Sequence, residues 1–252
     1  MRIIVKNANF NVYGLNDITG LMDEITTNYG GISDTAPIEH FVKALGADGS
    51  NAIWGKIKAL YMPVLSASTD GLNAFYDIIG KEKLNVTNAY TIEASRGVGP
   101  TNFGASSGTF TKSGMTQDGA SMFGLVTKSP RQSISSNAGI LSNLYDMKFN
   151  WALNTVSVQD GTNTATINHS DGFTKPVAYA LTAKESGGRT LFSKGQTKTS
   201  ASLSATPDSF TVYSGAYCDI SIFGMCEGLT SEEAAIIEAA IDTFVTEFGV
   251  LC

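Results

Sequence analysis

The clearest hydrophobic pattern lies near the end of the chain, where a period of two gives way to a period near four. Asp219–Gly224 alternates polar and apolar side chains, which is typical of a half-buried strand. Beyond Gly228, apolar side chains recur at helical spacing on one face: Ile237, Ile241, Phe244, Val245 and Phe248. The pattern predicts a helix over 230–248 whose apolar face packs on the rest of the protein.

The sequence marks both the start and the end of this expected helix. Thr230 and Glu233 have the spacing of a capping box, in which each side chain accepts a hydrogen bond from the other residue's backbone N–H. Gly249 is placed to adopt the left-handed conformation that ends many helices. The helix is therefore expected to begin just after Thr230 and to end just before Gly249.

Most of the chain from about residue 89 to 223 has the pattern of short strands. Turn pairs such as Asp160-Gly161 and Gly187-Gly188 separate several of them. The candidate strands are 90–94, 109–115, 122–127, 147–153, 155–159, 164–167, 177–183, 190–192, 210–213 and 218–223. So many short strands at regular spacing predict a mainly β fold, namely a sandwich or jelly roll.

The strand expected over 147–153 has the most regular alternation. Phe149, Trp151 and Leu153 share one face, opposite Lys148 and other small or polar residues. We interpret Trp151 as a core residue packed beside its apolar neighbours. Stacking of its ring on a sugar is the alternative.

The first 85 residues differ from the β region. Helices are expected over 35–45 and 50–62, with a shorter helix at 15–25 and a strand at 2–5. The second of these helices carries an apolar stripe and stops at a proline: Ile53, Ile57, Leu60, Tyr61 and Pro63. The segment 1–34 is apolar but interrupted by glycines, so we interpret it as an arm that packs on another chain.

Composition and charge narrow the possible partners. Of the 252 residues only 16% are charged, and 17 basic against 23 acidic side chains give a net charge of −6. Binding of a phosphate backbone requires a basic surface, so no nucleic-acid partner is expected. No apolar run approaches the ~20 residues of a membrane helix, and the run after Met1 is too short for a signal peptide. We therefore expect synthesis in the cytoplasm without membrane insertion.

The cysteines do not form a recognisable framework. Cys218, Cys226 and Cys252 have no C-x-x-C spacing, and their odd number argues against a set of disulfides. Free thiols are expected, with a Cys218–Cys226 bridge as the alternative.

Two features are reminiscent of catalytic sites, and the residues around them argue against both. Gly104–Gly108 matches G-x-S-x-G, but a nucleophile elbow needs a helix after the serine, and 109–112 alternates like a strand. Glu238 and Asp242 are four residues apart on the expected helix, where a solvated face is the simplest interpretation. We expect no enzymatic activity and no catalytic residue.

One cluster offers the ligand types of a metal site. Asp160, Asn163, His169 and Asp171 lie around two expected turns, and Ca²⁺ prefers such oxygen ligands. Asp and Asn are also frequent in hairpin turns for backbone reasons alone, and we favour that explanation. No metal and no cofactor are expected.

Two segments resemble motifs of tailed-bacteriophage virion proteins. Gly55–Leu65 (GKIKALYMPVL) resembles the K-x-K-A-L-Y-P helix that precedes the β domain of many such proteins. Phe223-Gly224 with Gly228–Glu233 resembles their F-x-G-x-G-L-T-x-x-E ending, although Met225–Glu227 intervenes between the glycines. The order of both motifs along the chain is also that of these proteins.

The resemblance implies a concanavalin-like, or laminin-G-like, jelly roll over 86–252 with the terminal helix packed on the sandwich. Residues 1–85 would form a partly helical region for attachment or oligomerisation. The implied function is that of a non-enzymatic virion structural protein, a head fibre, decoration or tail component, of a phage of Bacteroidota such as a crAss-like phage. Such proteins are usually homo-oligomers, with a trimer favoured, and contact other virion proteins. The alternative is a lectin-like module that binds host surface polysaccharide during adsorption.

Overall fold

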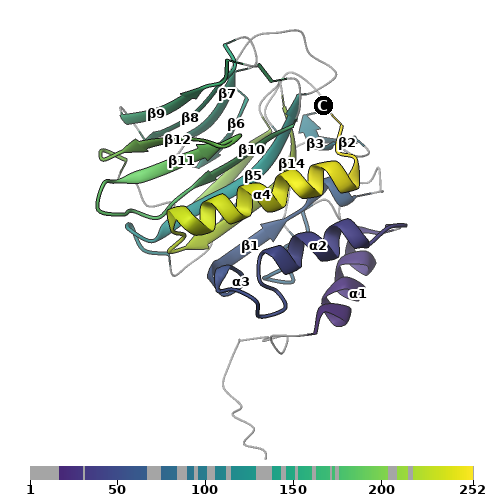
Figure 1. The fold of residues 1–252 in the computed structure, drawn as a ribbon. Coiled ribbons are helices and arrows are strands. Elements are labelled where there is room, and N and C mark those ends of the chain that lie inside the picture. The colour runs from purple at the N-terminus through teal and green to yellow at the C-terminus, as the bar shows by residue number, and fades with distance from the viewer. Residues whose placement is uncertain are drawn as a thin grey trace, which may run out of the picture.

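The structure of the protein is a computed structural model. It describes residues 17–30, 32–66, 75–83, 90–93, 96–100, 106–111, 115–128, 138–142, 146–150, 153–160, 163–170, 172–173, 176–203, 209–214 and 218–251. Two antiparallel sheets of eight and six strands face each other, and helices cover the outer face of the larger sheet (Figure 1). The expected mainly β sandwich with one C-terminal helix is confirmed.

The eight-stranded sheet has the order β12-β11-β10-β5-β14-β3-β2, and β1 also pairs with β14. Its strands are β1 (Ile57–Tyr61), β2 (Tyr90–Glu93), β3 (Gly97–Pro100), β5 (Ala120–Lys128), β10 (Val177–Leu181), β11 (Arg189–Ser193), β12 (Gln196–Ser200) and β14 (Cys218–Glu227). The six-stranded sheet has the order β4-β13-β6-β7-β8-β9. Its strands are β4 (Ser106–Thr111), β6 (Ala138–Ser142), β7 (Asp146–Asn150), β8 (Thr155–Asp160), β9 (Asn163–Asn168) and β13 (Ser209–Ser214).

The central strands of the larger sheet are buried on both faces. Along β10, Ala178 and Ala180 belong to the core beneath the helices, while the residues between and beside them belong to the core between the two sheets. On β14 a bulge lies between Ile220 and Ile222, and these two side chains consequently enter different cores. A strand with two apolar faces reads as a nearly continuous apolar run, because neither face meets water.

Two glycines allow aromatic rings to pack inside this sheet. Gly124 on β5 lies opposite Phe223, and Gly224 on β14 lies opposite Phe123. A Cβ on Gly224 would collide with the ring of Phe123, and one on Gly124 would collide with the hydroxyl of Tyr179. Packing of the aromatic rings therefore explains why a glycine follows the phenylalanine in the C-terminal motif.

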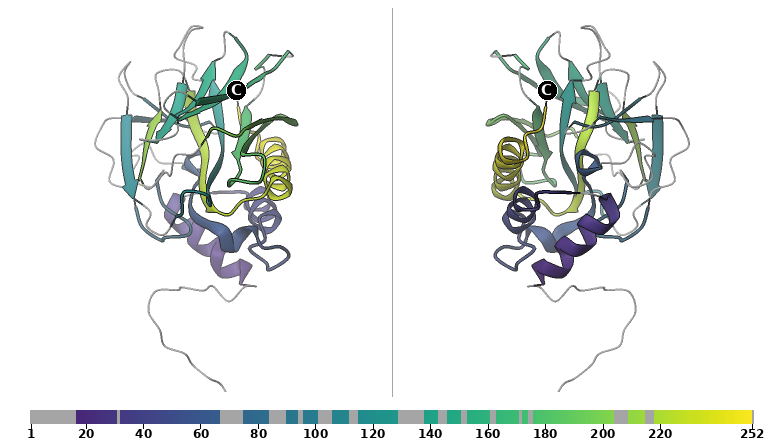
Figure 2. Two further views of the ribbon diagram at one scale, coloured as in Figure 1. Left: turned by 90° about the vertical axis from the view of Figure 1, so that its left-hand side faces the viewer. Right: turned by 90° about the vertical axis from the view of Figure 1, so that its right-hand side faces the viewer.

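Four helices belong to the described structure, together with a short 3-10 turn over Pro63–Leu65. They are α1 (Ile18–Tyr29), α2 (Ala36–Ala44), α3 (Ile53–Lys56) and α4 (Ser231–Phe248). The helix α4 lies along the larger sheet, and α1 to α3 gather at one end of the sandwich in both side views (Figure 2). The capping box of Thr230 and Glu233 and the left-handed Gly249 are both present, as predicted.

The helix expected over 50–62 is wrong for most of its length. Only Ile53–Lys56 is helical, and Ile57–Tyr61 is the strand β1, antiparallel to the second half of β14. On its other side, Leu60 donates its N–H to Asp77 and accepts one from Ile78, at 3.0 and 2.9 Å. Hydrogen-bonding groups are thus available on both sides of this segment, and these tertiary contacts outweigh its local helical pattern.

The strand expected over 147–153 ends earlier than its alternation suggested. β7 stops at Asn150, and Leu153 is 68% exposed at the turn to β8, so the expectation that it packs in the core is wrong. Phe149 is buried between the sheets as predicted. Trp151 lies outside the described residues, as do residues 2–5.

The side chain of Lys56 fastens the start of β1 to the start of α4. Its Nζ lies 2.8 Å from the carbonyl oxygen of Gly228 and 2.6 Å from Oε2 of Glu233. Desolvation raises the pKa of Glu233, but the hydrogen bonds from Lys56 and from the Thr230 N–H outweigh it, and the net pKa is lowered. The carboxylate that completes the capping box is therefore held ionised by a lysine from far away in the sequence.

This contact predicts an unequal effect of two lysine substitutions on stability. Lys56→Met should lower the free energy of unfolding by about 1–2 kcal/mol, because Glu233 keeps a partly buried charge without its ammonium partner. Lys43→Met, which breaks a more exposed i,i+4 pair with Glu39, should cost about 0.5 kcal/mol or less. Urea denaturation of both variants measures the difference, and equal losses would contradict the structural role of Lys56.

Candidate functional site

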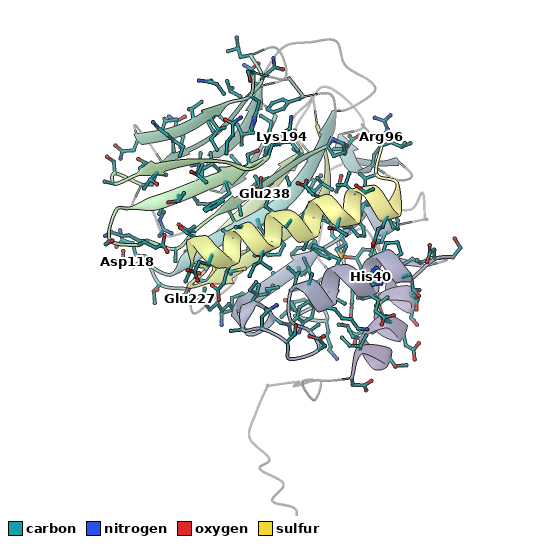
Figure 3. All side chains as sticks on the ribbon, viewed as in Figure 1. His40, Arg96, Asp118, Lys194, Glu227 and Glu238 are labelled. Carbon is teal, nitrogen blue, oxygen red and sulfur yellow. The ribbon has the colours of Figure 1, made fainter. Side chains whose placement is uncertain are left out.

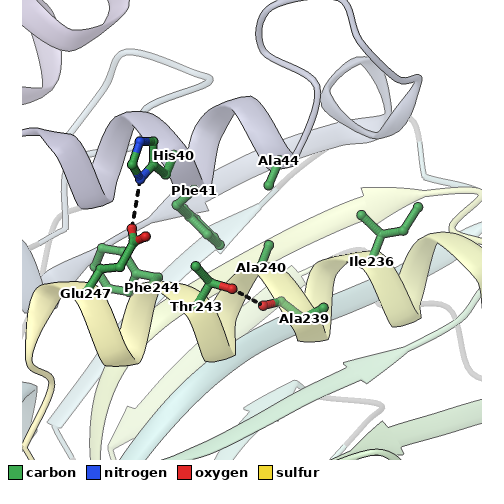
Figure 4. Close-up of a pocket in the computed structure, with 9 residues that line it drawn as sticks. All are labelled: His40, Phe41, Ala44, Ile236, Ala239, Ala240, Thr243, Phe244 and Glu247. Atoms are coloured by element: carbon green, nitrogen blue, oxygen red, sulfur yellow. Dashed lines mark hydrogen bonds and ion pairs between the residues drawn. The ribbon is translucent and has the colours of Figure 1, made fainter.

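The first candidate site is a groove between α2 and α4 with a volume of about 320 Å³ (Figure 4). The ring of Phe41 packs on that of Phe244 at 5.5 Å between centroids. The side chains that line the groove are His40, Phe41, Ala44, Ile236, Ala239, Ala240, Thr243, Phe244 and Glu247. Most of these are apolar, so the groove suits an apolar segment better than a polar small molecule.

One end of the groove is polar, and the other exposes an aliphatic side chain. His40 Nδ1 and Glu247 Oε2 lie 2.9 Å apart at the first end. Ile236 lies at the opposite end and is 43% exposed. The helix α4 gives this side of the groove a negative charge, since Ser231–Phe248 contains no lysine or arginine. Its five acidic residues are Glu232, Glu233, Glu238, Asp242 and Glu247.

The second candidate site is the outer surface of the three strands β7, β8 and β9. Strand pairing places Lys148, Ser157 and Thr166 in one row across the sheet, and Asn150, Thr155 and Asn168 in the next. The alternate residues point inward and are buried between the sheets: Met147, Phe149, Val156, Val158, Ala165 and Ile167. We call the outward residues the polar face: Lys148, Asn150, Thr155, Ser157, Gln159, Thr164, Thr166 and Asn168.

The polar face is rich in groups that both donate and accept hydrogen bonds. Hydroxyl and amide side chains have this property, and they match the hydroxyl groups of a carbohydrate. Its one cationic side chain, Lys148, donates to Gln159 at 2.6 Å. The same alternation that predicted these strands contains the signal for this surface, although sequence reasoning did not use it.

The third candidate is the carboxyl group of Glu238, labelled on α4 in Figure 3. The prediction of a solvated face is wrong here, because Glu238 is only 5% exposed, whereas Asp242 is exposed as expected. The turn between β11 and β12 reaches α4, and the Gly195 N–H donates to Glu238 at 3.1 Å. Burial raises the pKa of Glu238 to about 7, although the hydrogen bond from Gly195 lowers it.

The surroundings of Glu238 identify it as a packing position. Next to Gly195, the ammonium of Lys194 donates to the Gly172 carbonyl at 3.0 Å and lies 5.9 Å from the ring centroid of Phe173. His169 is buried against the same ring at 5.3 Å. The Gly195 hydrogen bond fastens the β11–β12 turn to α4, and the contacts of Lys194 fasten the same turn to Gly172 and Phe173.

Other carboxylates have structural partners at the end of the sandwich near the start of α4. Glu227 accepts the Thr116 N–H at 3.1 Å and the Thr116 hydroxyl at 2.5 Å. Glu185 accepts the N–H of Ser231 at 3.2 Å and so supports the first turn of α4. These side chains therefore hold loops and the start of a helix in place.

Among the described residues, the structure brings together only two of the metal ligands considered from sequence. Asp160 and Asn163 pair at one end of β8 and β9, whereas His169 follows the other end of β9 and is buried against Phe173. Asp171 lies outside the described residues. Within the parts of the chain that the structure describes, no three His, Cys, Asp or Glu side chains gather as a metal site. No described helix is both long and apolar enough to cross a membrane. The thiol of Cys226 is free and buried, as expected.

The packing residues predicted on the last helix lie at the interface with the sheet and with α2. Ile237, Ile241 and Phe244 are buried in the core beneath the helices. Phe248 is partly buried there, and its ring stacks on that of Phe244 at 5.0 Å. The G-x-S-x-G serine, Ser106, begins the strand β4, so a strand rather than a helix follows it.

No protein-family model and no curated protein matches the chain. Among solved structures, it resembles a Trypanosoma rangeli sialidase with a TM-score of 0.54 at 11% identity, over 91% of this chain and 38% of the sialidase chain. The chain thus spans little more than a third of that protein's length. This likeness concerns the fold alone.

Two further similarities are weaker. Domain 4 of AbnA, an extracellular arabinanase from Geobacillus stearothermophilus solved with arabinotriose, gives a TM-score of 0.46 at 14% identity, over 73% of this chain and 98% of that domain. The exoplasmic/lumenal domain of VIP36 bound to Ca²⁺ and Man2 gives 0.43 at 8% identity, over 71% of this chain and 93% of that one.

The buried carboxyl group predicts a pH dependence of stability. Because the pKa of Glu238 is raised in the folded state, its contribution is fully present below about pH 4.5 and is lost as the pH rises through about 7. Glu238→Gln should therefore melt at a higher temperature than the parent protein at pH 8 and at nearly the same temperature at pH 4.

The control is Glu232→Gln, which removes an exposed carboxylate from the same helix. At pH 8 it should not melt above the parent protein, because its exposed carboxylate has no burial cost to remove. Calorimetry at both pH values is the measurement, and a parallel pH profile for Glu238→Gln would contradict the assignment.

Proposed function

We propose that the protein is a non-enzymatic structural component of a tailed-phage virion, in which the helical region contacts other chains and the β-sandwich faces outward. The observation that carries this proposal is the position of the two segments that resemble phage virion proteins. Although about 160 residues separate them in the sequence, Tyr61 pairs with Phe223, and Leu60 pairs with Gly224.

Side-chain contacts join the same two segments. Lys56 of the first contacts Gly228 and Glu233 of the second. Two unrelated chance matches would have no reason to interlock residue by residue. Their contact therefore supports treating the resemblance as one structural unit, with the role that the resemblance implies.

The proposal predicts that the protein is part of assembled particles. The particles of the phage that carries the gene can be purified in a caesium chloride gradient and digested with trypsin. The digest should contain peptides of this protein in many copies per particle. Antibody raised against the recombinant protein should label either capsids or tails in electron micrographs. Peptides found only in the unassembled fraction would overturn the structural role.

A second candidate function, binding of host surface glycans, is favoured by the polar face. Its rows of hydroxyl and amide side chains lie on the opposite side of the sandwich from α4, and none of the described helices covers them. Carbohydrate binding needs such paired donors and acceptors rather than net charge. The face therefore suits a neutral oligosaccharide or polysaccharide.

The test is a glycan array followed by calorimetric titration with the glycans that bind. Ser157→Arg, in the centre of the polar face, should weaken binding at least about tenfold, a loss of about 1.4 kcal/mol. Ser186→Arg, at an exposed turn away from that face, is the matched control and should bind like the parent. Absence of binding at about 1 mM ligand would exclude this function at any useful affinity.

A further inference from the structure

The groove between α2 and α4 has the features of a docking surface for an extended apolar segment with basic ends. Its walls are mostly apolar, with His40 and Glu247 at one end, and Ile236 and Ala239 are exposed within it. The exposed carboxylates of Glu232, Asp242 and Glu247 lie along the helix that forms one wall. A segment that covers such a groove has to supply apolar side chains and positive charge together.

The chain itself contains a segment of this kind, Arg2–Lys6, with the sequence RIIVK. Three consecutive β-branched residues stand between an arginine and a lysine, and no acidic residue occurs before Asp17. Between Ile236 and Glu247 the helix rises about 16 Å, and five residues of extended chain cover about the same length. The segment matches the groove in length, in apolar character and in charge.

We propose that Arg2–Lys6 of one molecule docks in the α2–α4 groove of a second copy of this chain. The helix α1 packs on α2, and it starts at the end of the molecule away from α4 (Figures 1 and 2). To fill the groove of its own molecule, the segment would have to turn back around α2. Residues 7–16 reach about 33 Å when extended, which is enough to cross to a neighbour.

Charge makes this docking selective. Arg2 and Lys6 meet a helix that carries only carboxylates, so the attraction is not offset by a nearby lysine or arginine on α4. On α2, the lysine nearest the groove, Lys43, is paired with Glu39 at 2.5 Å. Association is therefore expected to weaken as the salt concentration rises, because ions screen exposed charges.

The test is the mass of the purified full-length protein by size-exclusion chromatography with light scattering. The parent protein should have a multiple of 26.6 kDa, and 1 M salt should shift it toward the single-chain mass. Ala239→Arg, which fills the groove with a cation, should be monomeric. Ala235→Arg, at an exposed alanine of the same helix outside the groove, is the matched control and should keep the parent mass.

A mixing experiment separates docking from general damage. Ile4→Glu alters the segment and leaves the groove intact, so it should also be monomeric. At protein concentrations low enough to dissociate the parent, both should have the same melting temperature. Ile4→Glu mixed with Ala239→Arg should restore association, because one chain supplies an intact groove and the other an intact segment. A monomeric parent, or an Ala239→Arg variant with the parent mass, would overturn the proposal. These masses do not depend on where the protein functions, so the outcome is independent of the proposed virion role.

Discussion

The pairing of β1 with β14 is the constraint on which the rest of the structure depends. It places a segment from the first quarter of the chain beside the last strand, and thereby brings the helical region onto the larger sheet. Lys56 then holds Gly228 and the capping carboxylate of Glu233, which fastens the first turn of α4 to the start of β1. Since α4 supplies a large part of the core beneath the helices, loss of the β1–β14 pairing would displace the whole helical layer.

The central sheet explains why both the helices and the second sheet are needed. Since β5, β10 and β14 carry apolar side chains on both faces, each face needs a cover. The six-stranded sheet covers one face and α4 with α2 covers the other, and burial of each large aliphatic or aromatic side chain contributes about 1.5–3 kcal/mol. The fold therefore leaves two different surfaces: a polar sheet face on one side and a helical face with an apolar groove on the other.

Local signals in the sequence were sufficient where local interactions decide the structure, and they failed where tertiary contacts decide it. The caps and the apolar stripe of α4 all lie within one continuous segment, Thr230–Gly249, so that helix was predicted almost to the residue. The local pattern of β1 predicts a helix because the partners that make it a strand are distant in sequence. β12, with residues exposed along its length, has no apolar pattern to detect.

The burial of polar and charged side chains could not be predicted from local sequence either. Arg189 is fully buried and donates to the carbonyl oxygens of Ala120, Gln117 and Thr182, and Glu238 is covered by a hairpin turn that only the fold brings to α4. The groove and the polar face could not be predicted from sequence for the same reason, since each is made from elements that only the fold brings together. In each copy the polar face and the groove lie on opposite sides of the sandwich, so the proposed self-association would leave the polar face uncovered.

Several weak sites on such an assembly would bind a repeating polysaccharide together, with an avidity about 10²–10⁴ above the single-site affinity. The division of the molecule into a helical side for assembly and a sheet side for recognition therefore unites both proposed functions in one arrangement.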